Sequence, residues 1–131
     1  MIKLMSALPN SLIAAQDKYT VTVTGILEVK VIEYLVCRRF VSCVGHESTA
    51  KLFSERLDLS VSMNREQVDL NVGDTIIAGL FTPPRRLAEG ILWTEEEILA
   101  MPINWVLVQK HVTECIQIVE GSNNYQPYLL V

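Results

Sequence analysis

Two hydrophobic periods occur along the chain, and each predicts one kind of element. Residues 18–24 alternate threonine with tyrosine or valine up to Gly25, which predicts a strand. Residues 27–38 fit either a helix or an alternating strand, and because this stretch is long for one strand, we expect a helix. Residues 47–57 gather apolar side chains on one side, the pattern of a short amphipathic helix.

A turn sequence in the middle of the chain separates two more strand patterns. Residues 68–72 alternate up to Gly73-Asp74, and residues 75–81 form a nearly continuous apolar run. We therefore expect a hairpin whose second strand lies at the centre of a sheet. Two prolines, Pro83-Pro84, end this strand and open a loop.

The last third of the chain completes the predicted fold. Thr94 begins a capping-box sequence, which predicts a short helix that ends at Pro102. Residues 103–108 and 112–119 have the composition of strands and are followed by a polar tail. Together these elements predict an α/β (α+β) fold for residues 1–131, a single domain with one mixed, mainly five-stranded sheet flanked by helices.

The composition is that of a soluble protein. Half of the 131 residues are hydrophobic, which suffices for a core, and no run approaches the roughly 18 apolar residues of a membrane span. The N-terminus lacks the long apolar stretch of a signal peptide, so we expect a cytoplasmic protein. An odd number of cysteines favours buried thiols over a disulfide framework; they are Cys37, Cys43 and Cys115.

The charge limits the class of partner. A net charge of −4 argues against a protein that binds long nucleic acid regardless of sequence, which requires a basic surface. All arginines nevertheless lie between residues 38 and 86, so a small anionic ligand could meet several of them. Position alone slightly favours the alternative, in which they are spread over solvated faces.

Gly45-His46 directly precedes the helix predicted at 47–57. The start of a helix leaves backbone N–H groups without partners and attracts phosphate or carboxylate, and Ser48 and Thr49 add hydroxyl groups there. At this point His46 would offer the side chain best suited to proton transfer near neutral pH. Hydroxyl residues at helix starts are more often caps, and a lone histidine is more often structural, so the residues alone leave both interpretations open.

Two polar segments further along could complete such a site. Asn64-Arg65 is a polar pair among strand formers, and Arg86 and Glu89 lie three residues apart in a loop that ends at Gly90. In one interpretation the arginine binds a phosphate while the glutamate orients or protonates a nearby histidine. In the other, the two form a surface salt bridge of little consequence.

Metal and nucleotide motifs are missing from the sequence. Cys37, Cys43 and His46 lack the paired close spacings and the fourth donor of a zinc site. The chain also contains no GxSxG, P-loop or GxGxxG sequence. We therefore expect neither a metal nor a cofactor.

A series of short motifs follows an order that resembles a known family. The motifs are Gly45-His46-Glu47-Ser48-Thr49-Ala50, Asn64-Arg65, Gly73-Asp74, Arg86-Leu87-Ala88-Glu89-Gly90 and Glu95 to Ile98. Over about residues 4–110 this ordered set resembles the viral ring nucleases, anti-CRISPR proteins that counter type III CRISPR systems.

The resemblance implies a homodimer that cleaves the second messenger cyclic tetra-adenylate without metal and so switches off type III CRISPR signalling. It implies His46 as the general acid, assisted by Glu89. Residues 4–7 match the first strand of the family, whose polar end approaches the ligand. The residues expected to bind substrate are Arg86, Arg65, Asn64, Ser48, Thr49 and Ser6.

The sequence departs from the family in several places. Thr82 stands where some members carry an amide, Pro83-Pro84 stiffens the arginine loop, and residues from about 111 to 131 extend past the usual end. These differences leave the size of the ring and the closure of the pocket open. Two other functions also stay open: a dimer that sequesters a cyclic nucleotide without cutting it, and a regulatory dimer without a nucleotide partner.

Overall fold

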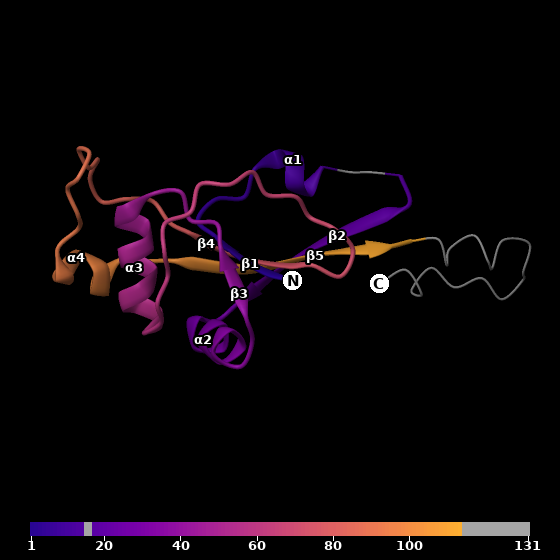
Figure 1. The fold of residues 1–131 in the computed structure, drawn as a ribbon, viewed down its shortest axis with the longest axis horizontal. Helices are drawn as coiled ribbons and strands as arrows, with labels where there is room; N and C mark the ends of the chain where they lie inside the picture. The colour runs from indigo at the N-terminus through magenta and orange to yellow at the C-terminus, as the bar shows by residue number, and fades with distance from the viewer. Residues whose placement is uncertain (15–16, 114–131) are drawn as a thin grey trace, which may run out of the picture.

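The sheet has five strands in the order β2-β5-β4-β1-β3, as a computed structural model describing residues 1–14 and 17–113 shows (Figure 1). β1 runs parallel to β3 and β4, whereas β5 runs antiparallel to β4 and β2. The predicted α+β domain with a mixed sheet is therefore confirmed. The strands are β1 (Ile2–Met5), β2 (Tyr19–Ile26), β3 (Phe40–Ser42), β4 (Thr75–Leu80) and β5 (Asn104–Val112).

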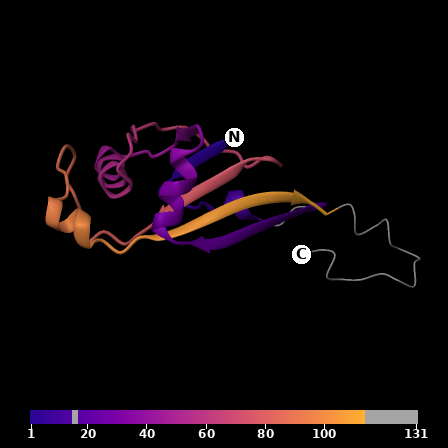
Figure 2. The same ribbon diagram turned by 90° about the horizontal axis from the view of Figure 1, so that it is seen from below.

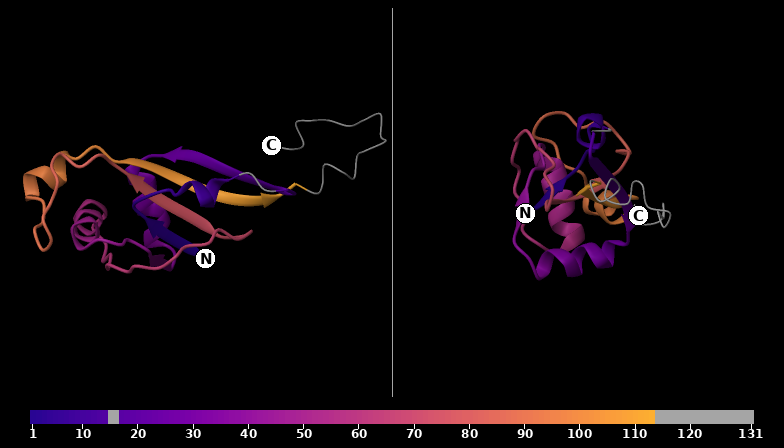
Figure 3. Two further views of the ribbon diagram at one scale, coloured as in Figure 1. Left: turned by 90° about the horizontal axis from the view of Figure 1, so that it is seen from above. Right: turned by 90° about the vertical axis from the view of Figure 1, so that its right-hand side faces the viewer.

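Helices pack on the two faces of this sheet. On β4, Ile77 belongs to a larger core that includes side chains of α2, α3 and α4. Its neighbours Ile76 and Ala78 belong to a smaller core on the other face, together with Leu12 of α1. Figures 2 and 3 show α3 on one side of the twisted sheet. The helices are α1 (Asn10–Ile13), α2 (Glu28–Val36), α3 (Glu47–Leu57) and α4 (Glu95–Ala100).

Arg56 on α3 fixes the helices of the larger core relative to one another. Its Nε and Nη2 donate to the carboxylate of Glu28 on α2 at 3.1 and 2.8 Å. Its Nη1 donates to the carbonyl groups of Ile98 and Met101, at the end of α4. α3 is therefore held to α2 on one side and to the end of α4 on the other.

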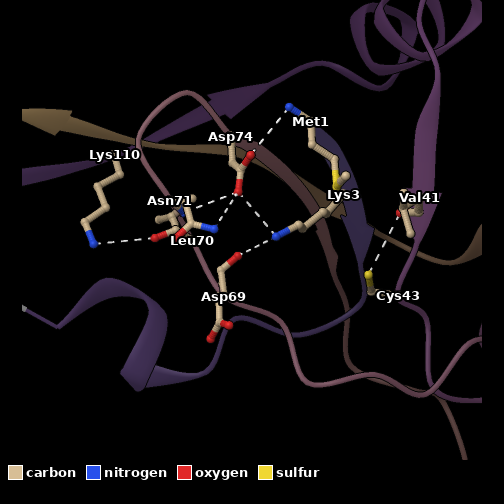
Figure 4. A network of polar contacts seen from close by, with 9 residues as sticks. All are labelled: Met1, Lys3, Val41, Cys43, Asp69, Leu70, Asn71, Asp74 and Lys110. Carbon is tan, nitrogen blue, oxygen red and sulfur yellow. Dashed lines mark hydrogen bonds and ion pairs between the residues drawn. The ribbon is translucent and has the colours of Figure 1, made fainter.

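A network around Asp74 fastens the first residues of the chain to the turn before β4 (Figure 4). The Asp74 carboxylate accepts a hydrogen bond from Lys3 Nζ at 3.3 Å and lies 3.5 Å from the amino group of Met1. The backbone N–H and the side-chain amide of Asn71 also donate to it, each at 3.3 Å. Because Lys3 lies on β1 and Asp74 directly precedes β4, the network aligns the starts of these neighbouring strands.

The predicted elements with the clearest periodicity are confirmed. The helix predicted at 27–38 is α2, and the helix predicted at 47–57 is α3. The strand predicted at 18–24 is β2, which continues through Gly25 to Ile26. The capping box is also confirmed, because Thr94 and Glu97 each accept a hydrogen bond from the other's backbone N–H.

The predicted hairpin of residues 68–72 and 75–81 is wrong. The turn at Gly73-Asp74 forms, but residues 68–72 are not a strand, and β4 pairs with β1 and β5 instead. The alternation before the turn has another cause: Leu70 is buried in the smaller core and Val68 packs against it, while Val72 is exposed. An alternating loop that covers a sheet face has the same pattern as a half-buried strand.

Two further predictions need correction. Residues 103–108 and 112–119 were expected as separate strands, but β5 runs unbroken from Asn104 to Val112, and residues 114–119 lie outside the described residues. Cys37 is exposed, so the prediction of a buried thiol is wrong there. Cys43 is half-buried, and burial followed by the nearby Glu66 raises the pKa of its thiol. Cys115 lies outside the described residues.

Candidate functional site

The carboxyl ends of three parallel strands define one edge of the sheet. β1, β3 and β4 share one direction, so the segments that follow Met5, Ser42 and Leu80 leave the sheet at the same edge. The start of α3 and the loop 81–94 lie beyond this edge (Figure 1). Ligands commonly bind outside the carboxyl ends of parallel strands, and here that region contains the predicted site residues.

His46 occupies the N-cap position of α3. Its backbone is extended, with φ −130° and ψ 139°, and its carbonyl accepts the N–H of Ala50 at 3.0 Å. The cap residue makes no side-chain hydrogen bond to the helix within the described structure, so the first-turn N–H groups are not capped by His46. Because α3 begins at Glu47, Ser48 and Thr49 lie inside its first turn, and neither occupies the cap position.

A cavity of about 540 Å³ opens beside this helix start. The polar residues His46, Ser48, Arg65 and Glu89 line it, so residues from three distant parts of the sequence meet here. Apolar side chains form much of the remainder, and two of them, Met63 and Ile91, are each 51% exposed. The lining residues are His46, Glu47, Ser48, Met63, Arg65, Leu87, Ala88, Glu89, Gly90, Ile91 and Leu92.

Arg65 lies against the glycine that precedes the candidate general acid. Its Nε donates to the carbonyl oxygen of Gly45 at 2.6 Å. A Cβ atom added at Gly45 would come within 3.5 Å of the Arg65 Cγ, so the arginine stem passes close to this backbone. The terminal Nη groups make no hydrogen bond within residues 1–14 and 17–113, and they are suited to an anionic ligand.

The loop that carries Glu89 is braced by the arginine before the predicted one. Arg85 Nε and Nη2 donate to the two carboxylate oxygens of Glu97 at 2.8 and 2.9 Å, and Nη2 also lies 3.4 Å from the Leu92 carbonyl oxygen. The hydrogen bond from Arg85 is the main cause that lowers the pKa of Glu97 to about 2. The salt bridge in this region is therefore Arg85–Glu97, and among the described residues none joins Arg86 to Glu89.

Several predicted binding residues lie outside the cavity wall. Thr49 is buried, with 5% of its surface exposed, so its hydroxyl does not face a ligand. Ser6 is half-buried at the end of β1, and Arg86 is exposed on the loop, but neither lines the cavity. The side chain of Asn64 donates to the Ser42 carbonyl oxygen at 2.8 Å, a contact within the fold.

Three of the six arginines serve the fold. Arg56 and Arg85 are paired with glutamates, and the guanidinium of Arg38 stacks on the ring of Tyr34 with its Cζ 4.0 Å from the ring centre. Of the arginines, only Arg65 lines the cavity formed by the described residues. Arg65 and the start of α3 are therefore the cationic groups that the described residues bring to the cavity, and the arginines do not gather there.

Sequence reasoning missed the apolar part of the wall. Met63 and Ile91 carry no chemistry that a motif search would notice, although each sits next to a predicted site segment. The available signals were the positions of these two residues. Met63 directly precedes the polar pair Asn64-Arg65, and Ile91 directly follows the loop glycine Gly90. In the described part of the chain, no group of three or more His, Cys, Asp or Glu side chains is arranged to hold a metal ion.

Comparison with known proteins places the chain in a family. The sequence model described as STIV B116-like matches residues 6–105. Uncharacterized protein 26 of Sulfolobus islandicus filamentous virus (isolate Iceland/Hveragerdi) is 40% identical over 67 residues, and ORF117 of Acidianus two-tailed virus is 37% identical over 73 residues. The matches cover 50% and 55% of this chain, but only 55% and 61% of the two viral proteins.

A solved structure has the same fold. B116 of Sulfolobus turreted icosahedral virus (STIV) superposes with a TM-score of 0.67 and 23% sequence identity, covering 82% of this chain and 97% of B116. In the described part of the chain, no helix has the length and apolar character needed to cross a membrane. By the match over residues 6–105, the chain belongs to the STIV B116-like family, which includes proteins of viruses.

Proposed function

We propose that the protein is a metal-independent ring nuclease that cleaves cyclic tetra-adenylate to linear di-adenylates. The observation that carries this proposal is the meeting of His46, Arg65 and Glu89 in one cavity at the start of α3. An imidazole and a carboxylate can transfer protons, and a guanidinium can stabilise the negative charge of a phosphodiester. The choice of cyclic tetra-adenylate as substrate rests on the motif resemblance to the viral ring nucleases. Membership of a family that includes viral proteins agrees with that resemblance.

The proposed reaction needs no external nucleophile. A ribose 2′-hydroxyl loses its proton to solvent and attacks the adjacent 3′-phosphorus, the bond to the 5′-oxygen of the next nucleoside breaks, and a 2′,3′-cyclic phosphate remains. His46 donates a proton to the departing 5′-oxygen as general acid, which contributes about two to four orders of magnitude. Glu89 assists His46, while Arg65 and the N–H groups of α3 stabilise the negative charge on phosphorus.

The apolar wall fits the other part of an adenosine nucleotide. Met63 and Ile91 are exposed apolar side chains beside the polar groups, and an adenine ring bound there would cover them. The cavity lies within the range of roughly 300–1,000 Å³ typical of sites for single small ligands. A ring of four nucleotides is larger than such a ligand, so we propose that it binds across two cavities of a homodimer.

The biological consequence would be the removal of a defence signal in the cytoplasm. Two cuts per ring, one by each His46 of the dimer, give two linear di-adenylates that no longer form the cyclic messenger. Type III CRISPR signalling would then stop.

Incubation of purified protein with cyclic tetra-adenylate and a chelator tests the proposal. We expect steady conversion to di-adenylates with 2′,3′-cyclic phosphate ends, in a protein that sediments as a dimer. Tight binding of an intact ring would instead favour the dimer that sequesters the ring without cutting it. One observation favours that alternative: in the described structure Glu89, the expected assistant of His46, makes no hydrogen bond to it. No change in melting temperature with cyclic tri-, tetra- or hexa-adenylate would favour the regulatory dimer.

A further inference from the structure

A short strap, residues 61–65, runs beside residues 42–45 at the end of β3. Val44 and Met63 form a parallel β-bridge, and the Asn64 N–H donates to the Val44 carbonyl oxygen at 2.8 Å. The strap is also tied to α3, because the hydroxyl of Ser54 accepts the N–H of Val61 at 3.0 Å. The strap therefore connects the middle of α3 with the segment that leads into α3.

Asn64 makes the side-chain contact at the centre of this strap. Its Nδ2 donates to the carbonyl oxygen of Ser42 at 2.8 Å. Ser42 is buried, with 8% of its surface exposed, and its hydroxyl donates in turn to the carbonyl oxygen of Ser62. Each segment therefore donates one side-chain hydrogen bond to a carbonyl of the other: Asn64 of the strap to Ser42, and Ser42 to Ser62 of the strap. Removal of the Asn64 amide would leave the Ser42 carbonyl without this donor.

The residue after Asn64 reaches the candidate site. Arg65 Nε donates to the Gly45 carbonyl oxygen at 2.6 Å, and that carbonyl belongs to the same peptide group as the N–H of His46. Any shift of the strap therefore moves the Arg65 guanidinium and rotates the peptide that carries the N-cap histidine. Both groups line the cavity, whereas Asn64 does not.

We propose that Asn64 is a positioning residue for the reaction, an inference that rests on the proposed ring nuclease function. Its amide does not contact the substrate; it fixes the strap so that Arg65 and His46 have the correct separation. This differs from the expectation from the sequence, in which Asn64 binds substrate. Misplacement of a catalytic group by about 1 Å is enough to lower a rate by about a hundredfold.

A double-mutant cycle on cyclic tetra-adenylate cleavage tests this role. We expect Asn64→Ala to lower kcat at least about tenfold with a smaller change in KM, because the substrate contacts stay while their alignment is lost. If Asn64 acts through Arg65, the double variant Asn64→Ala/Arg65→Ala cleaves no more slowly than Arg65→Ala alone. Rate losses that multiply in the double variant would overturn the proposal, because Asn64 would then act independently.

Asn71→Ala is the matched control for stability. It also removes one asparagine amide that donates within the fold, to Asp74, away from the cavity. We expect it to lower the melting temperature without lowering kcat. If Asn64→Ala does not fold, Asn64→Gln replaces it in the cycle, since an amide on a longer side chain misplaces the strap while filling the site.

An activity-independent readout separates this inference from the proposed function. The amide ¹H–¹⁵N signal of His46 reports the Gly45–His46 peptide group, to which Arg65 donates. We expect Asn64→Ala to shift this signal, with no further shift in the double variant beyond Arg65→Ala. A wild-type protein that leaves the ring intact would end the proposed function alone, whereas a His46 signal unchanged by Asn64→Ala would overturn the positioning role.

Discussion

At the scale of single residues, the candidate site depends on a histidine and an arginine, His46 and Arg65, whose contacts the sequence alone did not indicate. His46 serves as the N-cap of α3 without a side-chain hydrogen bond to the helix, and it lines the cavity. Arg65 uses one nitrogen for the fold and keeps its two terminal nitrogens for a ligand. Arg86 was expected to bind substrate together with Arg65, but its neighbour Arg85 pairs with Glu97, and neither Arg85 nor Arg86 lines the cavity.

Replacement of the candidate general acid tests the chemistry directly. His46→Ala should lower the cleavage rate at least about a hundredfold and leave the affinity for cyclic tetra-adenylate largely unchanged, because general acid catalysis acts mainly in the transition state. Single-turnover cleavage and equilibrium binding measure the two effects. His111→Ala is the control, since His111 lies on β5 outside the cavity wall. Normal cleavage by His46→Ala would remove the proposed mechanism.

The division of labour within Arg65 gives a second prediction. Lysine retains the charge, but its single ammonium group cannot reach the Gly45 carbonyl and a phosphate in the way that a planar guanidinium does. We expect Arg65→Lys to lower kcat/KM at least about tenfold, measured by steady-state cleavage. Arg38→Lys changes an arginine that stacks on Tyr34 instead, and it should cleave at the normal rate. Full activity of Arg65→Lys would mean that only its charge matters.

At the scale of elements, the packing of β4 against α3 holds the site in place. Gly79 on β4 lies beneath the rings of Trp105 and Phe53, whose centroids are 4.9 Å apart. Phe53 belongs to α3, so this contact sets the distance of the helix from the sheet. The Arg85–Glu97 pair then ties the loop of Glu89 to α4, which is held to α3 by Arg56.

Gly79→Ala should disturb this contact. A Cβ atom there would lie 2.6 Å from Trp105 and 2.7 Å from Phe53, so the rings would have to move. We expect a loss of about 1–3 kcal/mol in the free energy of unfolding, as for other overpacked cores, measured by urea denaturation. At Gly25 on the edge strand β2, a Cβ atom would meet nothing within 4 Å, so Gly25→Ala should be nearly neutral. Equal losses at both glycines would contradict this account.

At the scale of the whole molecule, the Asp74 network joins the amino terminus to the middle of the chain. Burial by itself would raise the pKa of Asp74, but the hydrogen bonds from Lys3 and Asn71, together with the Lys3 charge, lower it. A carboxylate with a lowered folded-state pKa stabilises the protein above the unfolded-state pKa of about 3.9, and the stabilisation disappears as the pH falls through the folded-state pKa. The contact that the Asp74 network makes between β1 and the turn before β4 is therefore expected to weaken at low pH.

Asp74→Asn should lower the melting temperature at pH 7, and the difference from the wild type should shrink steadily below about pH 4. Thermal melts followed by circular dichroism between pH 2 and pH 7 measure it. Asp69 contributes only its backbone carbonyl to the network, so Asp69→Asn should show no comparable change. A difference for Asp74→Asn that stays constant down to pH 2 would contradict the expected titration.

Much of the fold was predictable because its signals are local. The helical stripes of α2 and α3, the capping box of α4 and the apolar run of β4 each reflect burial of one face or of a whole strand, and periodicity reports burial directly. The failure at residues 68–72 has the same origin, since a loop that buries Leu70 alternates like a strand. Pairing partners are decided by strands far away in the chain, which periodicity does not identify.

The sequence by itself determined the class of fold, the helix that begins after His46 and the residue types that phosphodiester chemistry uses. Only the tertiary structure decided that Arg65 reaches the cavity while Arg86 does not, that Thr49 is buried, and that Asn64 bonds to Ser42. The physical reason is that backbone periodicity depends on near neighbours, whereas the direction of a polar side chain depends on contacts such as Asn64–Ser42, which are 22 residues apart.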